Sequence, residues 1–191
     1  MNFSFFIKNV LLGAGLAMDA CAVSMANGLK EPKMKINKTI LIAFIFGFFQ
    51  ALMPLIGYFV GHAILDLIEK FIPWIALVLL LFVGIKMIIE AVKGNDDETN
   101  DKALLTFKTL LVQGAATSID ALSVGLTFAD YTVSLAFISA LIIAVVTFVI
   151  SFIAVFIGKK FGTKFGSKAE IAGGIILVLI GIEIFVEKMF F

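Results

Sequence analysis

Long runs of apolar residues alternate with short charged segments along this chain. Six runs are each about as long as the helix of roughly 20 residues that crosses a bilayer core. They cover residues 5–28, 37–61, 72–93, 104–128, 133–157 and 170–190. Because a helix satisfies its own backbone hydrogen bonds in lipid, the pattern predicts an all-α integral membrane protein with six transmembrane helices.

The composition supports this prediction. Of the 191 residues, 61% are hydrophobic and 15% are charged, whereas soluble proteins average about half apolar and a quarter charged. A chain of this length has too little interior to hide so much apolar surface from water. The net charge of +1, with Lys as the only basic residue besides one His, gives no indication of a nucleic-acid partner. Nothing in the sequence indicates an obligate protein partner, and a lone Cys21 excludes an internal disulfide.

The lysines predict the orientation in the membrane. Eleven of them lie in or beside the segments that follow the first, third and fifth runs, and only three lie on the opposite side. Cytosolic loops carry the excess of lysine and arginine. We therefore expect these three segments to face the cytosol and both termini to face outward.

The two halves of the chain match at a constant offset of 101 residues. Asp19 matches Asp120, and Gly57 matches Gly158. Each half holds three predicted spans, so the second half must enter the membrane inverted relative to the first. We predict one membrane domain whose first repeat, linker and second repeat cover residues 1–95, 96–103 and 104–191. Inverted repeats are typical of transporters, which bind substrate near the midplane where the halves meet.

Asp19 and Asp120 lie deep in the first and fourth runs. An ionised carboxylate at the bilayer centre costs at least about 2.5–3.5 kcal/mol, and a bound cation is the simplest compensation. The alternative is a pair of protonated or locally hydrogen-bonded acids that join helices. Four nearby residues are candidate neutral ligands: Asn27, Gln50, Thr117 and Ser123. Oxygen ligands favour Mn²⁺, Mg²⁺ or Ca²⁺ over zinc or copper. We expect the ion to be cargo and predict no cofactor.

Five further residues are candidates for proton coupling or for a structural role: Pro54, Met53, Lys86, Glu90 and Glu183. Pro54 frees the backbone carbonyl of Gln50, either for an ion or simply as a kink. A thioether from Met53 would favour Mn²⁺ over Mg²⁺, although methionine is usually packing material. Glu183 is deeper than an interfacial residue needs to be. His62 falls at the end of a span, where an interfacial role is expected rather than metal binding.

Five motifs resemble the MntP family of bacterial manganese exporters, within the lysine-exporter-like group. They are residues 18–24 (MDACAVS), 46–57 (FGFFQALMPLIG), 84–90 (GIKMIIE), 116–125 (ATSIDALSVG) and 168–177 (KAEIAGGIIL). They span nearly the whole chain in order. The resemblance implies six spans in two repeats, manganese efflux across the bacterial inner membrane, and functional roles for Asp19 and Asp120.

Proton antiport is our hypothesis for the energy source. Expelling a divalent ion against 100 mV costs roughly 2 × 2.3 kcal/mol, and the chain has no phosphate-binding loop that would draw on ATP. In this hypothesis Asp19 and Asp120 hold metal and protons in turn. The sequence has no HExxH zinc motif and no activated nucleophile pair, so we predict that it is not an enzyme. Export of another divalent cation or of a basic amino acid, or a role as a membrane scaffold, are the alternatives.

Overall fold

The computed structural model describes residues 3–60, 72–93, 105–128, 131–165 and 167–190. The elements in these ranges are α1 (Phe3–Lys30), α2 (Ile36–Val60), α4 (Ile72–Lys93), α5 (Phe107–Ala116), α6 (Asp120–Leu126), α7 (Val133–Phe165) and α8 (Ser167–Phe190). All of them are helices, which confirms the all-α prediction for this part of the chain. The predicted linker at residues 96–103, His62, and the side chains of Lys86 and Glu90 lie outside what the structure describes.

Helices occupy all six predicted runs, but they do not all form simple spans. Within the described residues, α1, α2 and α7 are each long and apolar enough to cross a membrane. The fourth run, predicted as one continuous span, consists instead of α5 and α6, which are bent by 48° relative to each other. The fifth run continues as helix to Phe165 rather than ending near residue 157, so its lysines extend α7 instead of forming a loop.

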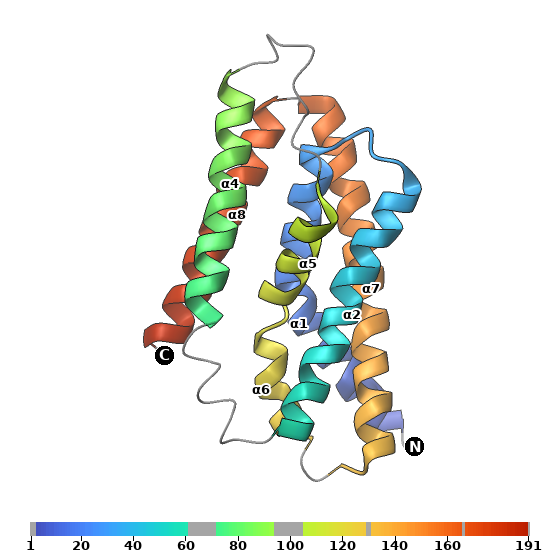
Figure 1. Cartoon of the computed structure of the whole chain (residues 1–191). Helices are drawn as coiled ribbons and strands as arrows, with labels where there is room; N and C mark the ends of the chain where they lie inside the picture. Colours follow the sequence, from blue (N-terminus) through green and yellow to red (C-terminus); the bar gives the residue numbers. More distant parts are fainter. Residues whose placement is uncertain (1–2, 61–71, 94–104, 129–130, 166, 191) are drawn as a thin grey trace.

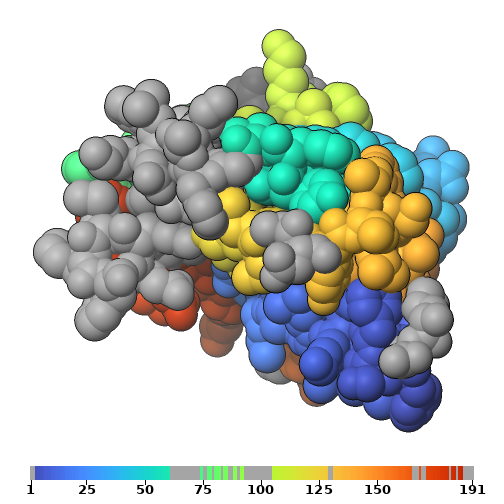
Figure 2. Space-filling view, turned by 90° about the horizontal axis from the view of Figure 1, so that it is seen from below, coloured from blue at the N-terminus to red at the C-terminus, as the bar shows by residue number. Residues whose placement is uncertain are grey.

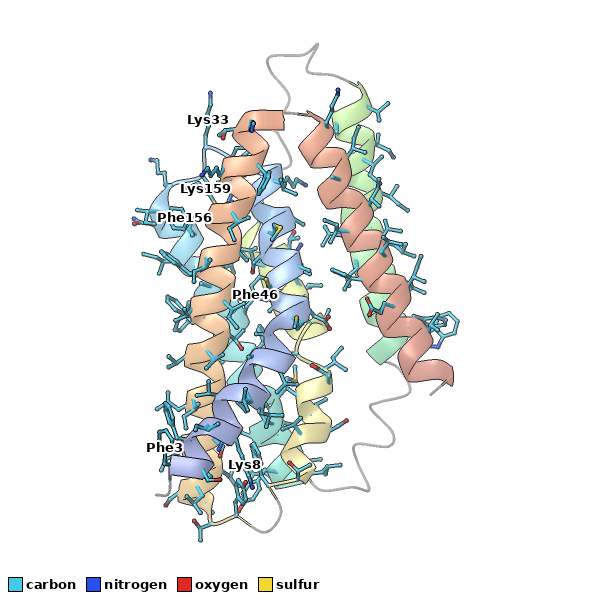
Figure 3. All side chains as sticks on the ribbon, turned by 180° about the vertical axis from the view of Figure 1, so that it is seen from behind. Phe3, Lys8, Lys33, Phe46, Phe156 and Lys159 are labelled. Carbon is cyan, nitrogen blue, oxygen red and sulfur yellow. The ribbon has the colours of Figure 1, made fainter. Side chains whose placement is uncertain are left out.

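Helices from the two halves of the sequence pack against one another. α1 lies along α7, while α2 packs against both α7 and the α5–α6 pair (Figures 1 and 3). α4 and α8 lie side by side at the flank of this group (Figure 1). A Cβ atom on Gly84 or on Gly174 would lie 2.7 Å from the carbonyl oxygen of the other glycine, so the backbones of α4 and α8 nearly touch.

Glycines also set the closest crossings inside the main group. Gly158 of α7 faces Gly28 of α1, and a Cβ atom on Gly158 would lie 2.1 Å from a carbonyl oxygen of α1. Gly57 of α2 faces Gly125 of α6, and a Cβ atom on Gly57 would lie 2.2 Å from a carbonyl oxygen of α6. In lipid, helix association depends on such close packing because the hydrophobic effect gives little drive. Figure 2 shows α1, α2, α6 and α7 gathered at the end of the molecule that carries the N-terminus.

The lysine-rich segments after the first and fifth runs lie at one end of the molecule. Lys33 and Lys159 lie at this end, and Lys8 lies at the opposite end (Figure 3). The Nζ atom of Lys159 donates a hydrogen bond of 2.8 Å to the carbonyl oxygen of Met34 and lies 5.2 Å from the ring centre of Phe156. The start of α1 and the end of α8 lie toward the other end (Figure 1). The lysine-rich segments after the first and fifth runs therefore lie at the opposite end of the folded molecule from the start of α1 and the end of α8.

Candidate functional site

The two predicted acidic residues lie on helices from opposite halves of the chain. Asp19 lies in the interior of α1, and Asp120 is the first residue of α6. Both side chains are partly buried. Ala20 and Ile119, the residues next to them in the sequence, belong to the same apolar cluster. Both aspartates therefore border the same apolar cluster, which extends through most of the helix group.

The break between α5 and α6 falls directly before Asp120. The hydroxyl of Thr117 donates to the carbonyl oxygen of Gln113 at 3.0 Å, and the hydroxyl of Ser118 donates to that of Gly114 at 2.8 Å. The backbone N–H of Ser118 then donates three residues back instead of four. Side-chain hydroxyls that donate to the carbonyl oxygens of the preceding turn compete with the backbone hydrogen bonds of the helix, and they weaken and bend it. Asp120 thus begins a new helical segment at a 48° bend.

Gln50 of α2 is fully buried and offers oxygen atoms close to the turn of Asp19. Its Nε2 atom donates a hydrogen bond of 2.9 Å to the carbonyl oxygen of Leu16, one turn before Asp19. Its Oε1 atom has no hydrogen-bond partner among the described residues. Pro54, which is also buried, lacks the N–H that would bond the backbone carbonyl of Gln50. Gln50 is therefore suited to supply neutral oxygen.

Asn27 forms a reciprocal amide pair with Gln113. Asn27 donates to Gln113 at 2.9 Å and Gln113 donates back at 3.3 Å, and each residue is only 1% exposed. The pair joins α1 to α5. Gln113 was not among our predicted ligands, although its position on the same helical face as Thr117 and Asp120 was a usable signal. The partner of Asn27 was not predictable, because it lies 86 positions away in the sequence.

The remaining predicted residues are more dispersed. The hydroxyl of Thr117 bonds to its own helix, and Ser123 is partly buried on α6. Met53 is partly buried and packs against both apolar clusters of the core. Glu183 is exposed on α8. Within the described residues, no three or more His, Cys, Asp and Glu side chains lie close enough together to hold a metal ion among themselves.

Two of the helices that pack around α1 and α6 carry no charged residue over most of their length. Residues 39–60 of α2 and residues 133–158 of α7 include no Lys, Arg, His, Asp or Glu. These helices pack against α1 and α6. α2 and α7 therefore contribute no charged side chain to the apolar part of the helix group that carries Asp19 and Asp120.

Comparison with known proteins gives a consistent result. A model of the Mntp family, described as "Putative manganese efflux pump", matches residues 33–185. A protein of Ruminiclostridium cellulolyticum named "Putative manganese efflux pump MntP" is 44% identical over 182 residues, covering 95% of this chain and 96% of the relative. Proteins named as putative manganese efflux pumps from Clostridium botulinum (45% identity, 95% and 94% covered) and Methanosarcina mazei (42%, 96% and 97% covered) are also similar. No solved structure matches.

Proposed function

The chain belongs to the Mntp family of manganese efflux pumps, and we propose that it exports Mn²⁺ from the cytosol through a site built on Asp19 and Asp120. The observation that carries this proposal is the broken span. Discontinuous helices at membrane depth are typical of transporter ion sites, because the unwound backbone exposes polar groups where a cavity or ion can use them. Here the break ends at an acidic residue.

The proposed ligands are two carboxylates and neutral oxygens. Asp19 and Asp120 supply the charge, and the unpartnered Oε1 atom of Gln50 is the best-supported neutral ligand. Thr117, Ser123 and Asn27 remain weaker candidates, because Thr117 and Asn27 already have hydrogen-bond partners. A set of oxygens suits Mn²⁺ and other hard divalent ions.

We propose that six spans form two inverted repeats around this site. In this arrangement α1 corresponds to the α5–α6 pair, α2 corresponds to α7, and α4 corresponds to α8. The α1–α7 contact then has its counterpart in the contact of α2 with α5 and α6, while the α2–α7 and α4–α8 contacts each join two corresponding helices. The structure contains all of these contacts. Gly57 and Gly158, which match at the 101-residue offset, each meet a glycine of the first helix in the other half. These correspondences support an approximate two-fold relation.

The orientation follows from the lysines. The end of the molecule that carries Lys33 and Lys159 lies opposite the two chain ends (Figures 1 and 3). Lysine-rich segments face the cytosol, so we propose that both termini face outward across the bacterial inner membrane. In this orientation Asn27 and Gln113 lie between the aspartates and the cytosolic end.

Proton exchange is the proposed driving force. Moving Mn²⁺ outward against 100 mV costs about 4.6 kcal/mol, twice the cost for a single charge. Exchange of one Mn²⁺ for two protons would move no net charge. Carboxylates can carry out this exchange because each holds either a share of a metal ion or a proton.

Flux into inverted proteoliposomes, followed with a Mn²⁺-sensitive dye, tests the proposal. We expect Asp19→Asn and Asp120→Asn each to lower the flux to the level of empty vesicles at normal reconstitution yield. Asp101→Asn, in the predicted linker, is the matched control and should transport normally. Retained flux in the two variants would exclude the site, and flux that ignores an imposed pH gradient would exclude proton exchange.

The alternatives give different results in the same assay. An exporter of a basic amino acid would accumulate labelled lysine, and an exporter of another ion would prefer Mg²⁺ or Ca²⁺ in competition. A membrane scaffold would show no flux, and the Asp→Asn changes would lower its abundance instead.

A further inference from the structure

One face of α1 is buried at the lysine-rich end of the molecule and uncovered toward the end that carries the N-terminus. The face carries five residues at helical spacing, namely Lys8, Gly15, Asp19, Ala22 and Ala26. Ala26 is 0% exposed, and Ala22 and Asp19 are partly buried. Gly15 and Lys8 are exposed, and a Cβ atom on Gly15 would meet nothing within 4 Å on the other described helices. The cover on this face therefore ends near Asp19.

The α5–α6 pair shows the same change from buried to exposed. Five polar residues, three or four positions apart, run along it: Gln113, Thr117, Asp120, Ser123 and Thr127. Gln113 and Thr117 are each 1% exposed. Asp120 and Ser123 are partly buried, and Thr127 is exposed. Each aspartate therefore lies where a buried helix face becomes an uncovered one.

The neighbouring helices account for both changes. At the lysine-rich end α8 begins beside the end of α7, and it packs on α1. Toward the other end α8 runs away from α1, and the end of α8 lies apart from the start of α1 (Figures 1 and 3). α6 turns by 48° at the break and packs mainly on α2. The faces of α1 and α6 that carry the aspartates are therefore uncovered over the same half of the molecule.

The opposite side of the two aspartates is closed. Asn27 of α1 and Gln113 of α5 join the two helices there through hydrogen bonds of 2.9 and 3.3 Å. Ala26 and Thr117, which lie on the aspartate faces at this side, are 0% and 1% exposed. Among the described residues, these two faces therefore offer no exposed side chain between the aspartates and the lysine-rich end.

Lipid does not suit the uncovered part of these faces. Lys8 and Asp19 lie on the face of α1, and Ser123 and Thr127 lie on the face of α6. Polar and charged groups are costly in hydrocarbon and normally face protein or a water-filled cavity. The apolar exposed side of α1 is a different one: Met18 is 72% exposed, and helical spacing puts it about 100° around the axis from Asp19. α1 therefore has one side suited to lipid and another suited to water.

We propose that the two uncovered faces line a water-filled path, here named the outer path, through which Mn²⁺ leaves the proposed site for the outer surface. Leu16 of α1, Ala121 of α6 and Ile143 of α7 share an apolar cluster that forms its floor. The hydroxyls of Ser123 and Thr127 lie along it as neutral oxygen ligands. Such oxygens hold a departing ion less strongly than carboxylates, and conduction requires sites weak enough to release the ion. This inference rests on the proposed function and orientation.

Thiol labelling from outside tests the outer path. Ser123→Cys and Thr117→Cys, each in a Cys21→Ser protein, place a thiol on the same face on either side of Asp120. In right-side-out vesicles, a membrane-impermeant cationic methanethiosulfonate reagent reaches thiols only through water. We expect Ser123→Cys to be modified and Thr117→Cys to stay unmodified. Met18→Cys is the matched control on the lipid side: it lies next to Asp19 in α1 and is exposed, and it should also stay unmodified.

Mn²⁺ export shows whether the outer path carries the ion. In vesicles loaded with Mn²⁺, modification of Ser123→Cys should abolish export. The reagent should leave wild-type export unchanged, because Cys21 lies about 200° around the axis of α1 from Asp19. Thr127→Cys gives the same two measurements farther along the face if Ser123→Cys is itself inactive.

Three results would overturn the outer path. They are resistance of both the Ser123→Cys and the Thr127→Cys thiol to the reagent, modification of Thr117→Cys from outside to the same extent, and export that persists after complete modification. If the wild type exports no Mn²⁺, the proposed function fails, while the labelling pattern still decides whether the water-filled path exists.

Discussion

The buried amide pair of Asn27 and Gln113 gives the sharpest quantitative test of this structure. Replacing Asn27 with Leu, or Gln113 with Met, preserves most of the side-chain volume and removes the amide. Each single change leaves the other amide buried without its partner. Because both residues are 1% exposed, we expect each single variant to lose about 1–3 kcal/mol of unfolding free energy.

The double variant should recover much of this loss. With both amides replaced, no buried polar group remains unsatisfied, and such a replacement is often nearly neutral. Hydrogen bonds between membrane helices average about 0.6 kcal/mol and reach about 1.7 kcal/mol. With two hydrogen bonds, of 2.9 and 3.3 Å, we expect a coupling energy of about 1–2 kcal/mol.

Unfolding by SDS in mixed micelles measures all four proteins of this cycle. A double variant as unstable as the sum of its single variants would refute the reasoning, because the two amides would then not be coupled. Mn²⁺ flux provides a second measurement. If Asn27 is a metal ligand rather than a helix contact, the double variant will be stable but inactive, whereas recovery of both stability and flux assigns Asn27 to packing.

Two further predictions concern the backbone. Gly158→Ala would put a Cβ atom 2.1 Å from a carbonyl oxygen of α1, so we expect it to cost about 1–3 kcal/mol in the same unfolding assay; Gly15→Ala, with no heavy atom within 4 Å of its Cβ position, is the control and should be neutral or slightly stabilising. Thr117→Leu with Ser118→Ala should restore a continuous helix, seen as slower hydrogen exchange at residues 117–122, and should abolish export; unchanged exchange rates would show that the hydroxyls do not cause the break.

The helical elements were predictable from the sequence because lipid demands long apolar helices. All six predicted runs contain helix, and the predicted gathering of the lysine-rich segments after the first and fifth runs is confirmed at one end of the molecule. The structure adds that two glycines matched in the repeat lie at close helix crossings. Gly57 and Gly158, matched in the sequence, each meet a glycine of the other half.

Contacts between distant polar residues were not predictable in the same way. The hydropathy pattern shows that Asn27, Gln50 and Gln113 lie in apolar segments, but it contains no information on which amide faces which helix. The pairing depends on the rotation of α1 against α2 and α5, which many small contacts set together. The side-chain amide of Gln50 donates to a backbone carbonyl oxygen. Because every residue has a backbone carbonyl, the sequence does not indicate which one accepts this hydrogen bond.

The break before Asp120 shows how two matching halves come to differ. At the offset of 101 residues, Leu16, Ala17 and Met18 of the first half correspond to residues 117–119 of the second. The first three are good helix formers without competing hydroxyls, and α1 runs through them unbroken. In the second half, two hydroxyls bond to carbonyls of the preceding turn, and the helix stops. Asp19 is therefore held by a rigid helix and Asp120 by the start of a separate segment. In the proposed site, a rotation of α6 about this break would change the spacing between the two carboxylates and so provide a way to bind and release the ion.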